Sequence, residues 1–105
     1  MIFGRRGRFH DVVGRQLAMF EREHADLLRE VRAAERAYDD ADRDEATQRY
    51  GEYVDLVETG TEALAEIRDA YAATLDEDTA ARYAAEFDRT VARRLPDFAL
   101  ELGDT

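Results

Sequence analysis

The chain contains no cysteine, no serine and no lysine, and it has a single proline among its 105 residues. Without cysteine it can form neither disulfide bonds nor thiolate metal sites. The lack of both cysteine and serine removes the nucleophiles that covalent hydrolases usually employ. No apolar run approaches the ~18 residues that a membrane-spanning helix needs, and no hydrophobic signal region follows the N-terminal arginines. We therefore expect a non-enzymatic protein located in the cytoplasm.

Acidic side chains dominate the charge of the chain. Its 25 aspartates and glutamates outnumber 15 basic residues, all of them arginine, and the formal net charge is −10. Such a surface repels nucleic-acid phosphates, so no bulk nucleic-acid binding is expected. Either a GC-rich genome or adaptation to high salt would account for an acidic, lysine-free composition. The length corresponds to one domain.

Apolar residues recur every three or four positions over most of the chain, which predicts amphipathic α-helices and an all-α fold. The expected helices cover residues 9–39, 44–75 and 78–95. A basic, flexible N-terminal arm of residues 1–8 precedes them, and a C-terminal tail of residues 96–105 follows.

Four residues suggest where these helices end or bend. Asp42 or Asp44 is the expected N-cap of the second helix, because a short carboxylate accepts hydrogen bonds from free backbone N–H groups. Gly14 should let the first helix fray or bend, and Pro96 should end the third.

The spacing of the apolar positions in the first predicted helix matches that in the second when the second is read backwards. The apolar positions of the third helix match those of the second in the same way. Three of the predicted pairs are Phe9 with Leu75, Tyr38 with Ala46, and Tyr71 with Tyr83. This pattern predicts a long antiparallel helical hairpin, similar to a coiled coil, with a shorter third helix. The resulting architecture is a three-helix bundle that dimerisation could complete.

Because the third helix is shorter than the hairpin, the turn end of the hairpin should lack a third helix. Apolar side chains there would form a contact surface. The predicted interaction residues are Leu28, Tyr38, Tyr50, Tyr53, Val54, Leu56, Phe98, Leu100 and Leu102. Either the tail folds back over this surface, or a second copy packs against it and completes a four-helix bundle. We favour a homodimer, and an unknown protein partner is a further occupant to consider.

Glu21 and His24 form a Glu-x-x-His pair, whose spacing places both side chains on one helical face. Ferritin-like carboxylate proteins use this element twice, with two further glutamates, to hold two metal ions. Here it occurs once, so a metal-binding bundle is only an alternative, and no cofactor is expected. The favoured role of His24 is packing, with its ring filling the gap left by Gly60 and hydrogen-bonded to a carboxylate.

The N-terminal arm combines Ile2 and Phe3 with three arginines, Arg5, Arg6 and Arg8. A peripheral factor that contacts an anionic membrane surface or a nucleic-acid backbone is the second alternative. Stable membrane attachment normally takes two such signals, so this arm alone is not expected to provide it. The main hypothesis is a small acidic helical module for protein–protein interaction or assembly, which associates with itself.

Overall fold

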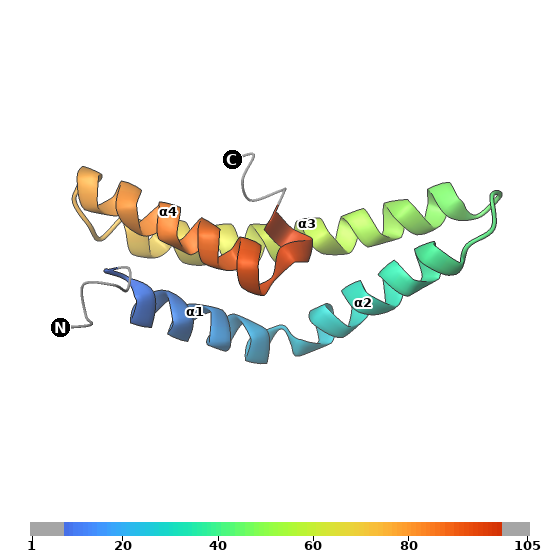
Figure 1. Cartoon of the computed structure of the whole chain (residues 1–105), viewed down its shortest axis with the longest axis horizontal. Helices are drawn as coiled ribbons and strands as arrows, with labels where there is room; N and C mark the ends of the chain where they lie inside the picture. Colours follow the sequence, from blue (N-terminus) through green and yellow to red (C-terminus); the bar gives the residue numbers. More distant parts are fainter. Residues whose placement is uncertain (1–7, 100–105) are drawn as a thin grey trace.

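The computed structural model describes residues 8–99 of the chain. This part is all-α, without β-strands, and contains four α-helices and one 3₁₀ turn. The elements are α1 (His10–Glu23), α2 (Ala25–Asp40), α3 (Ala46–Ala72), α4 (Glu77–Arg94) and the turn η2 (Pro96–Phe98). The molecule is elongated, measuring 55 × 26 × 21 Å, with α1 and α4 along one half of α3 and α2 along the other (Figure 1).

The first predicted helix, residues 9–39, is two helices in the structure. The chain leaves the helical conformation at His24, where φ is −114° and ψ is 30°, and α1 and α2 meet there at an angle (Figure 1). Gly14, the predicted bend, lies inside α1 and does not interrupt it. The prediction of one continuous helix is therefore wrong, and four α-helices replace the expected three.

The bend follows from the way α4 packs. This helix contacts both α1 and α3, whereas α2 packs along α3. The buried ring of Tyr83 lies between Phe9 and Tyr71, with centroid distances of 5.4 and 4.7 Å. Inserting a large ring between α1 and α3 spreads these helices apart, and the change of direction at His24 lets α2 return to α3. The predicted contact of Tyr71 with Tyr83 is confirmed.

Aspartates shape both connections between the long helices. Asp42 accepts a hydrogen bond from the backbone N–H of Glu45 at 3.0 Å, and α3 begins one residue later with Glu45 at its N-cap. The prediction that Asp42 or Asp44 is the N-cap is therefore wrong, because Glu45 occupies that position. At the start of α4, Asp76 accepts from the backbone N–H and the hydroxyl of Thr79, at 2.8 and 3.0 Å. These two bonds lower the pKa of Asp76.

The turn η2 brings the chain back onto α3. Phe98 is only 1% exposed, and its ring lies directly over Gly60, where a Cβ atom would stand 2.4 Å from the ring carbon Cε1. The ring also meets Phe20 of α1 edge-on, with centroids 6.1 Å apart. Phe98 thus belongs to the core, and it fills the gap at Gly60 that the sequence analysis assigned to His24.

Thr61 provides a test of this core. Its side chain is buried, and within residues 8–99 its hydroxyl is the buried side-chain polar atom that has no hydrogen-bond partner. An unpaired buried hydroxyl costs stability, and valine has nearly the same shape without it. We expect Thr61→Val to raise the free energy of unfolding by about 1 kcal/mol, measured by urea denaturation. A decrease would mean that the hydroxyl finds a partner, such as a buried water molecule.

Candidate interaction surface

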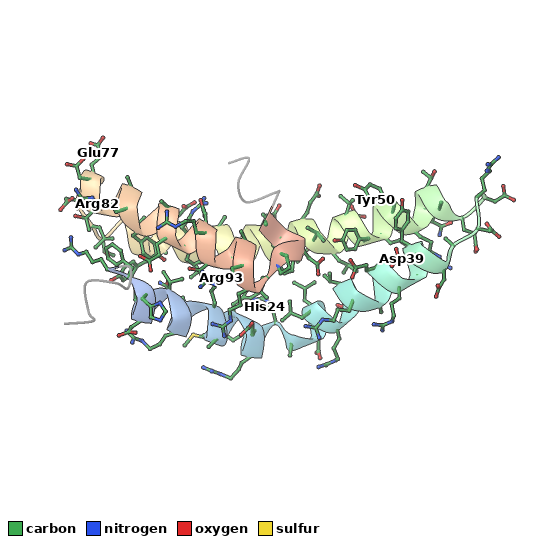
Figure 2. All side chains as sticks on the ribbon, in the orientation of Figure 1. His24, Asp39, Tyr50, Glu77, Arg82 and Arg93 are labelled. Carbon is green, nitrogen blue, oxygen red and sulfur yellow. The ribbon has the colours of Figure 1, made fainter. Side chains whose placement is uncertain are left out.

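Within residues 8–99, one half of the structure consists of two helices without a third. We call this half the two-helix arm and define it as residues 25–59, which comprise α2, the following turn and the first part of α3. The helix α4 ends at Arg94, and η2 follows it across the middle of α3 (Figure 1). In Figure 2, Tyr50 and Asp39 mark the arm, at the opposite end from Glu77 and Arg82.

Two tyrosine rings are exposed on the arm. Tyr38 is 40% and Tyr50 is 52% exposed, and their ring centroids lie 5.3 Å apart across α2 and α3. Together with Ala46 and Thr47 they line a surface hollow of about 210 Å³. Tyr38 and Ala46, a predicted pair, thus lie at the same level of the arm. The ring of Tyr53 extends the row, 6.4 Å from that of Tyr50.

The other predicted interaction residues are less exposed. Leu28, Tyr53 and Leu56 are partly buried and pack against the core, and Val54 is also half-buried. Phe98 is in the core, as described above. Leu100 and Leu102 lie outside the described residues. The candidate surface therefore narrows to Tyr38 and Tyr50, with Tyr53 at its edge.

Carboxylates lie near Tyr53, at one end of this row of rings. The Tyr53 hydroxyl donates a hydrogen bond to Asp97 of η2 at 3.2 Å. Burial, together with the negative charges of Asp97 and Glu35, raises the pKa of Tyr53 to about 12. Asp97 of η2 and Glu35 of α2 therefore both lie near Tyr53, on one side of the row, and make the local electrostatic potential negative.

The whole two-helix arm is acidic. Residues 25–59 contain eleven carboxylates and five arginines, a net charge of −6 out of the −10 of the chain. Some of these arginines are already engaged: Arg29 pairs with Asp26, and Arg49 pairs with Glu45 and Glu52. The surface thus combines exposed aromatic rings with an excess of negative charge.

The two residues of the Glu-x-x-His pair have different neighbours in the structure. Glu21 binds Arg94 of α4 through both carboxylate oxygens, at 2.7 and 3.2 Å. His24 occupies the bend, its ring 4.8 Å from that of Phe20 (Figure 2). Over residues 8–99, no group of three or more His, Asp or Glu side chains is arranged to hold a metal ion.

Three interactions that matter for the surface were missed by the sequence analysis. They are the Glu21–Arg94 ion pair, the Tyr53–Asp97 hydrogen bond and the packing of Phe98 on Gly60. Gly60 carried only a weak signal, because a glycine inside a helix can leave room for another group, but Gly14 and Gly51 have open space around them. Nothing local identified Phe98 as that group.

These features define an all-α protein whose three-helix body continues into an acidic two-helix arm with exposed tyrosines. None of the helices in the described part is long and apolar enough to cross a membrane. Comparisons of the chain with protein-family models, with curated proteins and with solved structures gave no match.

Proposed function

We propose that the protein is a non-enzymatic interaction or assembly module of the cytoplasm, which associates with itself through the two-helix arm. The observation that carries the proposal is the pair of exposed rings, Tyr38 and Tyr50, beside a hollow on a part of the molecule where residues 8–99 provide no third helix. Tyrosine is enriched at protein interfaces, because its ring buries apolar area while its hydroxyl remains satisfied.

A second copy could cover the arm in two ways. It could contribute its own arm and complete a four-helix bundle, or it could contribute a different part of its surface. In both arrangements Tyr38 and Tyr50 lose their contact with water. Neither of the alternatives, a metal-binding bundle or a peripheral membrane or nucleic-acid factor, has comparable support. Glu21 of the Glu-x-x-His pair is engaged by Arg94. Ile2, Phe3, Arg5 and Arg6 of the N-terminal segment lie outside the described residues.

The solution mass tests the proposal directly. We expect light scattering to give twice the chain mass of 12.0 kDa, and we expect Tyr50→Glu to give the monomer mass at the same concentration. A charged side chain in place of the most exposed ring would lose its hydration on association, which is unfavourable. Tyr50 is preferred over Tyr53 for this test, because Tyr53 also holds Asp97 within its own chain.

Met19→Glu is the matched control for this experiment. Met19 is 51% exposed on α1, outside the arm, so the variant loses a similar exposed apolar side chain and gains the same charge. It should keep the dimer mass. A monomeric wild-type protein at high concentration, or a dimer that both variants retain, would show that the tyrosines of the arm do not mediate self-association.

A further inference from the structure

The charge of the two-helix arm bears on what covers it. If two arms packed against each other, each would bring a net charge of −6 into the same interface. Like charges in contact oppose association, and complementary charges favour it. The arm is therefore better matched by a positively charged segment than by a second arm.

The side chains on the arm narrow the chemistry of that segment. The rings of Tyr38, Tyr50 and Tyr53 form a row with successive centroid distances of 5.3 and 6.4 Å, and Asp97 lies at the end of the row, bonded to Tyr53. An arginine guanidinium stacks on tyrosine faces and also forms paired hydrogen bonds with carboxylates. Arginine is thus the side chain that uses both features of the surface at once.

The chain itself contains a segment with this chemistry. The first ten residues include three arginines and no carboxylate, and two apolar residues, Ile2 and Phe3, precede the first arginine. One other stretch, residues 89–96, also has three arginines and no carboxylate, but it lies mostly within α4, and Arg94 there is paired with Glu21. Of the three N-terminal arginines, Arg5 and Arg6 are adjacent in sequence.

These arginines cannot reach the arm of their own chain. Phe9 is held beside Tyr83 and Glu86 at the start of α1, and the 14 and 16 residues of α1 and α2 separate it from the turn. At 1.5 Å per residue, Phe9 lies roughly 40 Å from Tyr38. Arg5 precedes Phe9 by four residues, which span at most about 14 Å. Figure 1 shows the start of α1 and the turn after α2 at opposite ends of the molecule.

We propose that Arg5 and Arg6 of a second copy bind the row of Tyr38, Tyr50 and Tyr53 on the two-helix arm. An antiparallel pair of copies related by a two-fold axis makes this contact twice, because each start of α1 then lies beside the arm of the other copy. The inference rests on the proposed self-association and specifies the segment that the arm binds.

The first test compares two double variants by light scattering and sedimentation. Arg5→Gln/Arg6→Gln removes four guanidinium contacts from each dimer, so we expect the dissociation constant to rise about thirtyfold or more. Arg15→Gln/Arg22→Gln is the control: it makes the same charge change at two exposed positions of α1 and should leave the dissociation constant nearly unchanged. Far-ultraviolet circular dichroism checks that both variants keep their helices.

Mixing defective variants gives a second test. Tyr38→Ala/Tyr50→Ala keeps its arginines, and Arg5→Gln/Arg6→Gln keeps its arm. Each should be monomeric alone, but a mixture retains one of the two contacts and should form a heterodimer. Added sodium chloride should weaken the wild-type dimer, because salt screens attraction between opposite charges. If one two-helix arm packed on another, salt should instead strengthen the dimer, because it would screen the repulsion between two negative surfaces.

The outcomes separate this inference from the proposed function. A wild-type dimer that Tyr50→Glu dissociates, but that Arg5→Gln/Arg6→Gln leaves intact and salt strengthens, overturns the arginine contact and leaves self-association through the arm in place. A mixture that stays monomeric also overturns the contact. A wild-type protein that is monomeric at every concentration overturns both.

Discussion

Replacing Phe98 with alanine is expected to lower the free energy of unfolding by about 3–5 kcal/mol, the range for a buried phenylalanine. The ring is 1% exposed and is enclosed by Phe20 and by the backbone of α3 at Gly60. Its removal leaves a cavity where α1, α3 and η2 meet. It also loosens the attachment of η2 and so weakens the hydrogen bond between Asp97 and Tyr53. Chemical denaturation followed by circular dichroism measures the loss.

Pro96→Ala is the control within the same turn. Pro96 is exposed, so its replacement acts mainly on the entropy of the unfolded chain and should cost less than about 1 kcal/mol. If Phe98→Ala cost no more than Pro96→Ala, the segment after α4 would contribute little to the fold.

Gly60→Ala tests whether the two residues act as a unit. In the wild-type background the new methyl group meets the Phe98 ring, which Phe20 keeps from moving away, so we expect a loss of stability. In the Phe98→Ala background the obstacle is gone, and alanine should stabilise the helix by about 1 kcal/mol relative to glycine. The effect of the same substitution thus changes sign, and additive effects would contradict the packing described here.

The all-α class and the approximate extent of α3 and α4 could be predicted because they depend on local signals: apolar periodicity, aspartates before a helix and a proline after one. The break between α1 and α2 at His24 could not be predicted from such signals. The apolar pattern continues through His24 without a change of phase, and the chain bends there because a distant residue, Tyr83, separates α1 from α3.

The candidate surface could be predicted only in part, because some of its features depend on local signals and others on contacts between distant residues. Within the described part of the chain, the two-helix arm lacks a third helix because α4 is short, which the apolar periodicity predicts, and Tyr38 and Tyr50 are exposed there. Phe98 was assigned to the surface because a 3₁₀ turn of three residues has no periodicity from which docking could be inferred. Its partner is a glycine, which has no side chain to suggest the contact.

The second large effect is a loss of stability at alkaline pH, caused by the tyrosines. Burial raises the pKa of Tyr83 to about 12, although its hydrogen bond to Gln16 opposes the shift. The pKa of Tyr53 is also raised to about 12. In the unfolded chain both titrate near pH 10. Between these values the unfolded state has already lost protons that the folded state keeps, so stability is complete below about pH 10 and falls as the pH rises toward 12.

The composition makes this transition easy to assign. The chain has no lysine and no cysteine, and its arginines stay protonated throughout this range. Of the side-chain types present in the chain, only tyrosine has an ordinary pKa between about pH 9 and pH 12. Urea denaturation at successive pH values, with tyrosine ionisation followed by ultraviolet absorbance, should show the two changes together.

Tyr83→Phe isolates the contribution of the buried hydroxyl. At neutral pH the variant loses the 2.7 Å hydrogen bond to Gln16 and should be less stable than the wild type by about 1 kcal/mol. A pKa difference of about two units corresponds to roughly 2–3 kcal/mol that the wild type loses by pH 12, and the variant has no hydroxyl there to ionise. The two stability curves should therefore cross near pH 11, whereas parallel curves would mean that Tyr83 ionises in the folded protein as readily as in the unfolded chain.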